Sequence, residues 1–259
     1  MTNYTYLLYG LQDEYYLEAA YSIGTLLRRI DARSARVIVF TDQPEKIKAW
    51  PVVCESISGQ LAEMQGKTRF IHRAKLCVIL RCLELYPGNV VYLDSDTFVR
   101  GDIQSLADKL APGRVAIMDA FEAKNPIAEL AGFQAKLSDQ TAYGYTKDSW
   151  MLNSGVIGIH RQDAVLIRRA LELCDWLLAA GMHRHTMEQF SLSEVFRLAP
   201  VKVLFSRGTI VHYVKAKYYM RQKISEVMRA RKKQPWEFER PIPYWYPFVK
   251  FLKLIGQQP

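Results

Sequence analysis

A strand, a helix and a second strand follow one another within the first 40 residues. Residues Tyr4–Tyr9 are rich in β-forming side chains, and apolar residues then recur at helical spacing from Asp13, a candidate N-cap, to Arg29. Ala35–Phe40 again has the composition of a strand. Two strands joined by one helix in this way usually lie side by side and parallel. We therefore expect an α/β fold with a mixed, mainly parallel sheet flanked by helices.

The rest of the chain continues to alternate helices and strands. A long helical pattern covers residues 68–86, and Asn89–Leu93 is a nearly continuous apolar run, as expected of a strand covered on both faces. Further strands are predicted at 115–118, 155–159, 201–205 and 209–212, further helices at 163–180 and 188–196, and an irregular stretch at 125–145.

Composition limits the class of protein. The 259 residues are 49% apolar and 24% charged, which is typical of a globular chain and excludes a disordered or collagenous one. No apolar run approaches the roughly 18 residues that a membrane span requires. The four cysteines show no paired metal-binding spacing and no charged-then-apolar segment opens the chain, so we expect a cytoplasmic protein.

Positive charge is concentrated at the C-terminal end. The net charge is +9, yet the residues after Pro200 alone hold 13 Lys or Arg against 3 acidic residues. This distribution argues against a nucleic-acid-binding core and favours contact of the tail with an anionic membrane surface or an anionic ligand. From Pro235 onward aromatic residues and lysines alternate, which suits the headgroup region of a bilayer. The alternative is that these aromatic side chains pack on the core.

Two aspartates follow the apolar strand. Asp94 and Asp96 stand two residues apart where Asn89–Leu93 ends. Open α/β sheets bind ligands in the crevice outside the carboxyl ends of their strands. Carboxylate oxygens at that point suit Mg²⁺ or Mn²⁺ bound together with phosphates of a substrate. The alternative is that both aspartates only cap the turn after the strand.

Four motifs together resemble one class of enzyme. They are Tyr92–Thr97 (Tyr-Leu-Asp-Ser-Asp-Thr), Leu152–Val156 (Leu-Asn-Ser-Gly-Val), Glu188 with Gln189, and His212 with Lys217. In this order they are similar to the nucleotide-diphospho-sugar transferases of the GT-A fold, and in particular to glycosyltransferase family 8, which includes glycogenin and bacterial lipopolysaccharide galactosyltransferases. The resemblance covers most of residues 4–217 and implies a GT-A, Rossmann-like fold.

The resemblance implies a metal and phosphate site. Asp94, Asp96 and His212 would bind Mn²⁺ or Mg²⁺, with Asp94 also near the ribose of a UDP-sugar. Lys217 has the position of the family's phosphate-binding lysine, and Lys215 would add a second contact to the diphosphate or face solvent. The family's closing motif, His-x-x-Gly-x-Lys-Pro-Trp, is kept only in part, because this chain lacks its Gly and its Pro-Trp. The alternative for His212 is to end its strand without binding an ion.

The same resemblance implies a donor-sugar site. Asn153, Ser154 and Gly155 would contact the donor, with Gly155 leaving room for the hexose. Glu188 would bind sugar hydroxyls, and Gln189 would lie near the anomeric carbon. The alternative for Asn153–Gly155 is a loop that only enters a strand. The alternative for Glu188 and Gln189 is a solvated pair at the start of a helix.

Weaker candidates lie elsewhere in the chain. Tyr9 is a candidate to stack on uracil, and Asp42 to meet the base or ribose. Arg73 resembles the family's arginine on the helix before the Asp-x-Asp strand, and Asp119 is a candidate sugar contact. Each has an ordinary structural interpretation as well.

These expectations define a hypothesis of function. The chain is predicted to be a metal-dependent hexosyltransferase that moves a hexose from a UDP-sugar to a glycan or lipid-linked acceptor with retention of configuration. Residues 1–217 would form the transferase domain and 218–259 a basic, aromatic extension, with peripheral attachment to the inner face of the membrane left open. The alternative is a catalytically silent GT-A-like binding module that associates with a membrane or a partner through its tail.

Overall fold

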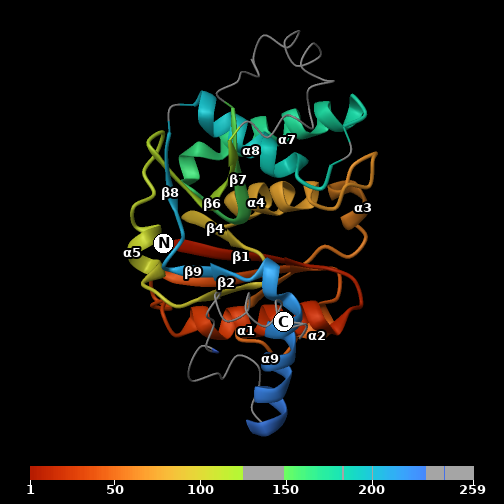
Figure 1. The fold of residues 1–259 in the computed structure, drawn as a ribbon, viewed down its shortest axis with the longest axis vertical. Helices are drawn as coiled ribbons and strands as arrows, with labels where there is room; N and C mark the ends of the chain where they lie inside the picture. The colour runs from red at the N-terminus through yellow and green to blue at the C-terminus, as the bar shows by residue number, and fades with distance from the viewer. Residues whose placement is uncertain (125–148, 183, 200, 232–241, 243–259) are drawn as a thin grey trace, which may run out of the picture.

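The computed structural model describes residues 1–124, 149–182, 184–199, 201–231 and 242, which form a central sheet between two layers of helices (Figure 1). The strands of this sheet are β1 (Thr2–Leu8), β2 (Ala35–Thr41), β3 (Val53–Ser56), β4 (Asn89–Leu93), β6 (Val115–Lys124), β7 (Trp150–Ile159) and β8 (Lys202–Phe205). Their spatial order is β3-β2-β1-β4-β7-β6-β8, and all neighbours are parallel except β7, which runs antiparallel to β4 and β6. The mixed, mainly parallel sheet predicted from the sequence is confirmed.

Helices cover both faces of the sheet. They are α1 (Asp13–Leu27), α2 (Pro44–Ile47), α3 (Leu61–Met64), α4 (Arg73–Leu85), α5 (Ile103–Ala107), α7 (Ala164–Ala179), α8 (Met187–Leu198) and α9 (Lys217–Arg231), with short 3-10 turns η3 (Arg161–Asp163) and η4 (Val214–Ala216). One apolar core joins the sheet to α4, α7 and α8, and a second joins it to α1 and α5. Figure 1 shows these two helical layers on opposite sides of the sheet.

Strand β4 lies in the middle of the sheet and is buried on both faces. Its alternate residues Val90 and Tyr92 enter the core under α4 and α7, whereas Val91 and Leu93 enter the core under α1. This explains the nearly continuous apolar run, because neither face of the strand meets solvent. The chain therefore leaves β4 at the centre of the sheet edge, where Asp94 follows.

A second, two-stranded sheet joins distant segments. Strand β5 (Thr97–Val99) follows Asp96 and pairs antiparallel with β9 (Ile210–His212), with Thr97 opposite His212. The backbone N–H of Tyr213 also donates to the carbonyl of Asp96, at 3.0 Å. The pairing of β5 with β9 therefore places His212 close to the residues that follow β4.

Several predicted boundaries were wrong. The helix expected from residue 68 begins at Arg73, because the preceding turn includes Arg69 in the left-handed region, with φ 56°. Asp13 is the first residue of α1 and makes no capping bond, since Gln12 is the N-cap. Strands β6 and β7 extend further than expected because they pair with each other beyond the parallel part of the sheet. The irregular stretch predicted at 125–145 lies outside the described residues.

The beginning of the predicted C-terminal extension is helical. α9 packs on α1, and its buried residues Met220 and Ile224 lie in an apolar cluster with Tyr21 and Phe98. Ile242 belongs to the same cluster. The remaining tail residues on which membrane contact was predicted, 232–241 and 243–259, lie outside the described part of the chain.

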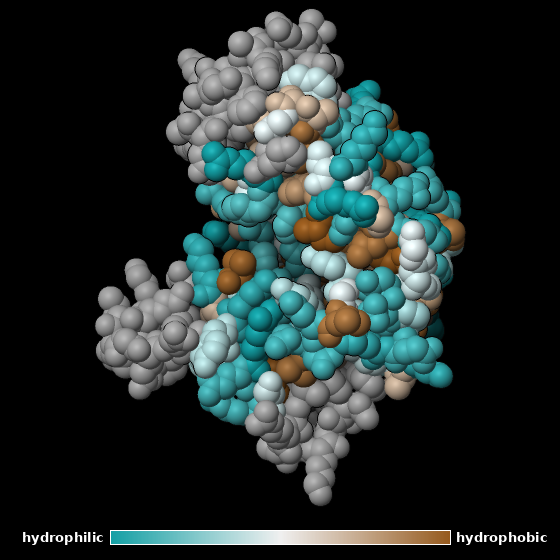
Figure 2. Space-filling view, turned by 90° about the vertical axis from the view of Figure 1, so that its right-hand side faces the viewer, coloured by the Kyte–Doolittle hydropathy of each residue, from teal (hydrophilic) through white to brown (hydrophobic). Residues whose placement is uncertain are grey.

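The surface gives no broad apolar face in the view of Figure 2, where hydrophobic side chains lie in separate groups between hydrophilic ones. Scattered groups of this kind are normal on globular proteins. No helix among the described residues combines the length and apolarity needed to cross a bilayer.

Candidate functional site

A cavity of about 610 Å³ opens at the carboxyl ends of β1 and β4. Its walls come from strands β1, β4, β6, β7 and β9, from helices α1, α4 and α8, and from η4 and the first residue of α9. Many of the predicted site residues line it: Tyr9, Asp94, Asp96, Asn153, Ser154, Glu188, Gln189, His212, Lys215 and Lys217. A pocket of this size at this edge of an α/β sheet is where a small-molecule substrate is expected to bind.

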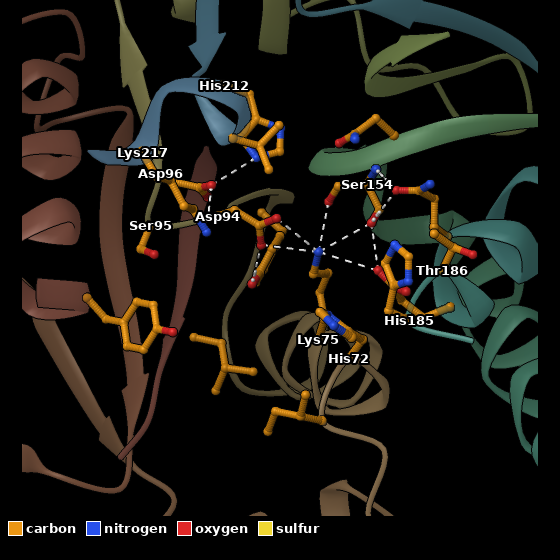
Figure 3. A pocket seen from close by; sticks show the side chains of 18 of the residues that line it. His72, Lys75, Asp94, Ser95, Asp96, Ser154, His185, Thr186, His212 and Lys217 are labelled. Carbon is orange, nitrogen blue, oxygen red and sulfur yellow. Dashed lines mark hydrogen bonds and ion pairs between the residues drawn. The ribbon is translucent and has the colours of Figure 1, made fainter. Parts of the chain in front are cut away.

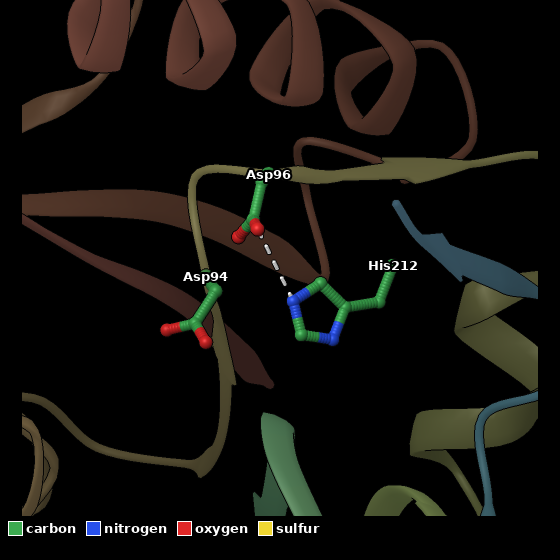
Figure 4. A group of neighbouring side chains, drawn as sticks. All are labelled: Asp94, Asp96 and His212. Carbon is green, nitrogen blue, oxygen red and sulfur yellow. Dashed lines mark ion pairs between the residues drawn. The ribbon is translucent and has the colours of Figure 1, made fainter. Parts of the chain in front are cut away.

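Asp94, Asp96 and His212 meet at one end of the cavity. Each offers one ligand atom, and these atoms all lie within 4.8 Å of one another. Figure 4 shows the imidazole reaching toward Asp96 from β9, with Asp94 on the adjoining turn after β4. The distance from Nε2 of His212 to Oδ2 of Asp96 is 3.4 Å.

This donor set fits a divalent cation. Two carboxylates and one imidazole are ligands that suit Mn²⁺ and related ions, and Asp96 and His212 are largely buried, with side-chain exposures of 6% and 9%. Asp94, with an exposed side-chain fraction of 25%, borders the open cavity. A cation held here would face the cavity on the Asp94 side.

Asp119 orients His212. Its Oδ2 lies 2.8 Å from Nδ1 of the imidazole, and its side chain does not line the cavity. Burial alone would lower the pKa of His212, but hydrogen bonds to Asp119 and Asp96 outweigh burial and raise it to about 10. A carboxylate on the far nitrogen is the usual support of a metal-binding histidine. The structure thus places Asp119 behind His212, whereas the sequence suggested a sugar contact.

Gly155 makes room for the same imidazole. A Cβ added at Gly155 would fall 2.4 Å from Nδ1 and 2.5 Å from Cε1 of His212. No side chain fits that space while the imidazole occupies it. The absence of a side chain at Gly155 thus leaves space for the His212 imidazole, and the predicted contact of Gly155 with a hexose stays a prediction.

Lys217 forms an ion pair with Asp96. Its Nζ lies 3.0 Å from Oδ2 of Asp96, and Figure 3 shows the two side chains next to each other. Burial alone would raise the pKa of Asp96, but hydrogen bonds and charges from His212 and Lys217 outweigh burial and hold that pKa below its usual range. Asp96 is therefore an anion in this environment. Lys215 lies nearby on η4 and lines the cavity.

Lys75 is a site residue that the sequence analysis missed. Its ammonium lies 3.1 Å from both carboxylate oxygens of Asp94, 3.5 Å from Oε1 of Glu188, and 3.2 Å from the carbonyl of Ser154 (Figure 3). Burial alone would lower the pKa of Lys75, but the two carboxylates outweigh burial and raise it. The sequence did carry a signal for Lys75, because it lies on the same helix face as the apolar residues Val78 and Cys82. A lysine on a core-facing side of a helix indicates a buried partner, since lysine is almost never buried without one.

Glu188 has one oxygen without a partner. Ser154 donates its hydroxyl to Oε1 at 2.6 Å, whereas the buried Oε2 has no hydrogen-bond partner among the described residues. The side chain is only 3% exposed and lines the cavity. An unsatisfied carboxylate oxygen at such a place is suited to accept a hydrogen bond from a ligand hydroxyl.

Gln189 is held from both ends of its amide. Its Oε1 accepts from the backbone N–H of Ser154 at 3.1 Å, and its Nε2 donates to Glu122 at 2.6 Å. Asn153 also donates to Glu122, at 3.2 Å. Glu122, which the sequence analysis did not single out, lines the cavity beside them.

Three of the weaker candidate residues differ in whether they line the cavity. Tyr9 lines the cavity. Asp42 accepts from the backbone N–H of Gly10 at 3.0 and 3.2 Å, which ties the loop after β1 to the end of β2, and it does not line the cavity. Arg73 pairs with Asp175 at 2.5 and 2.9 Å and lines a separate cavity between α3 and α4. The structure does not bring Arg73 to the site.

Comparison with known proteins bears on the fold. No protein-family model and no curated protein sequence matches the chain. Among solved structures, mouse xyloside xylosyltransferase 1 in its apo form is similar with a TM-score of 0.51 and 12% sequence identity, over 80% of this chain and 86% of that one. The chain therefore has a GT-A, Rossmann-like fold.

Proposed function

We propose that the chain is a glycosyltransferase that uses a divalent cation to move a hexose from a UDP-sugar to a glycan or lipid-linked acceptor, as a member of glycosyltransferase family 8. The observation that supports it best is the cluster of Asp94, Asp96 and His212 beside Lys217, in the main cavity of a GT-A fold. Mouse xyloside xylosyltransferase 1, which has a similar fold, is itself a glycosyltransferase.

Asp94, Asp96 and His212 would hold the cation in this proposal. When bound, Mn²⁺ or Mg²⁺ supplies positive charge that offsets the charge developing on the departing diphosphate. Asp119 engages Nδ1 of His212, so Nε2 would be the nitrogen that holds the cation. Lys217 is close enough to exchange its contact with Asp96 for a phosphate oxygen, and Lys215 is placed to add a second positive charge.

Lys75 and Glu188 would recognise the donor sugar. The free Oε2 of Glu188 can accept from a sugar hydroxyl, and Lys75 fixes the Glu188 carboxylate relative to Asp94. Asn153 and Ser154 complete the same wall. Tyr9, which also lines the cavity, is our candidate for stacking on uracil.

Retention of configuration is what the resemblance to glycosyltransferase family 8 implies, and the character of Gln189 bears on how it would be achieved. Its amide is a poor nucleophile, and its oxygen already accepts from the N–H of Ser154. We therefore favour attack by the acceptor on the face that the leaving group vacates, with the leaving phosphate accepting the acceptor's proton. Gln189 and Glu188 would stabilise the positively charged sugar carbon on the other face.

Two measurements test this function. Isothermal titration should show UDP binding that depends on Mn²⁺, and a panel of UDP-sugars should reveal Mn²⁺-dependent release of UDP. Asp96→Asn should abolish both, whereas Asp175→Asn, at the ion pair with Arg73, should leave both unchanged. Full turnover in excess chelator would contradict the role of the metal, and an inverted product, seen by NMR, would contradict retention.

A further inference from the structure

Helix α9 carries one of the site residues on its first turn. Lys217 is the first residue of α9, and its ammonium reaches Asp96 at 3.0 Å. Helix α9 packs on α1, and among its described residues only Lys217 lines the cavity. The position of α9 on α1 therefore sets how far Lys217 reaches into the site.

One buried ion pair joins the two helices. Nη2 of Arg221 donates to Oε2 of Glu18 at 3.0 Å, and the side chain of Glu18 on α1 is fully buried. Among the described residues, no other basic side chain is hydrogen-bonded to Glu18. Burial raises the pKa of Glu18, and the hydrogen bond and charge of Arg221 oppose that rise. A buried carboxylate that lost this partner would be strongly destabilised.

The ion pair lies one helical turn from Lys217. Residues i and i+4 of a helix share a face, so Arg221 and Lys217 point to the same side of α9. The neighbouring contacts of Met220 and Ile224 with the core are apolar and non-directional. A hydrogen-bonded ion pair, in contrast, fixes the rotation of the helix about its axis.

Arg221 also touches the wall of the cavity. Its guanidinium lies over the ring of Tyr15, 5.3 Å from the ring centre, and Tyr15 lines the cavity. Arg221 itself does not line the cavity. Two residues close to Arg221, Lys217 one helical turn away and Tyr15 under its guanidinium, do line the cavity.

We infer that Arg221 is a positioning residue, whose ion pair with Glu18 holds α9 so that Lys217 reaches the diphosphate of the donor beside Asp96. This inference rests on the proposed function, because it assigns the diphosphate to Lys217. It gives a role to a buried acidic residue of α1 and a basic residue of α9 that no motif identified.

A double-mutant cycle in UDP binding tests it. The dissociation constant of UDP is measured at saturating Mn²⁺ for the wild-type chain, Lys217→Ala, Arg221→Ala and the double variant. We expect Arg221→Ala to weaken UDP binding about tenfold, the effect of about 1.4 kcal/mol, and to add little once Lys217 is already alanine. Arg221→Lys should recover part of the affinity, because it keeps a positive charge near Glu18.

Two further variants keep the test interpretable. Lys223→Ala removes an exposed ion pair with Glu226 on the same helix and should leave UDP binding unchanged. Glu18→Gln, which preserves side-chain volume, should also weaken UDP binding. This variant is used in the test if Arg221→Ala does not fold.

The outcomes separate the two proposals. If the wild-type chain binds UDP but the losses from Lys217→Ala and Arg221→Ala simply add, or Arg221→Ala and Glu18→Gln have no effect, the positioning role is refuted and the proposed function stands. If the wild-type chain binds no UDP with Mn²⁺, the proposed function itself is refuted.

Discussion

The carboxylate of Asp119 lies 2.8 Å from Nδ1 of His212, so that Nε2 is the nitrogen turned toward Asp96. The two residues are on β6 and β9, far apart in the sequence. Their contact selects which imidazole nitrogen is available to a cation.

Replacing this carboxylate should weaken metal binding. Asp119→Asn keeps the size of the side chain but removes the charge behind the imidazole, and loss of such a supporting group typically lowers metal affinity about 10- to 100-fold. Titration with Mn²⁺ measures the effect. Asp175→Asn is the control, since Asp175 pairs with Arg73 outside the cavity. Equal Mn²⁺ affinities in the Asp119 variant and the wild type would contradict the role of Asp119.

A methyl group at Gly155 should displace His212. The added Cβ would lie 2.4 Å from Nδ1 of the imidazole, which must then move. Gly158→Ala, on the same strand, is the matched control, because its Cβ would instead meet Ile117 in the core. Both variants should lose about 1–3 kcal/mol of stability from overpacking. Only Gly155→Ala should also lose Mn²⁺ affinity, and a variant that kept full affinity would show that the imidazole is not a ligand.

Removing the buried ammonium of Lys75 should destabilise the fold. Lys75→Met leaves Glu188 and Asp94 without their shared counter-charge, and breaking a buried ion pair on one side costs about 3–5 kcal/mol. Combining Lys75→Met with Glu188→Gln should recover part of that loss, since one uncompensated charge is then removed. Urea denaturation measures both. A double variant less stable than the sum of the single changes would contradict this coupling.

Acidification should destabilise the chain through His72. Burial lowers the pKa of His72 below its ordinary value of 6.5, although nearby carboxylates oppose this effect. The unfolded chain then takes up the proton at a higher pH than the folded chain does. Stability contributed by neutral His72 is present above about pH 6.5 and is lost as pH falls toward its folded pKa. The free energy of unfolding should therefore decrease less between pH 7.5 and 5 in His72→Gln than in the wild type, and parallel decreases would refute this assignment.

The fold was accessible from the sequence because its main signals are local. The apolar run before Asp94 and the strand–helix–strand unit at the start of the chain both follow from burial and periodicity. The short elements β3, α2 and α3 were not predicted, because four residues carry too little periodic signal. The start of α4 was misplaced because the left-handed turn at Arg69 left no strong sequence mark.

The candidate site was partly accessible. Motifs of a resembling family pointed to residues that the fold brings into one cavity, whereas Arg73 was chosen over Lys75. These two residues are two positions apart on α4 and so project to nearly opposite sides of the helix. Without the helix orientation, the sequence could not say which one faces the cavity. The partnership of Asp119 with His212 depends on tertiary contact between distant strands and has no local signal.

The central claim is that Asp94, Asp96 and His212 hold one divalent cation together. It is tested most directly by anomalous diffraction at the manganese absorption edge, from crystals grown with Mn²⁺ and UDP. We predict a single strong peak coordinated by both carboxylates and by Nε2 of His212, with Lys217 turned from Asp96 to a phosphate oxygen. A nucleotide bound in the cavity with no manganese peak between these three side chains would contradict the account.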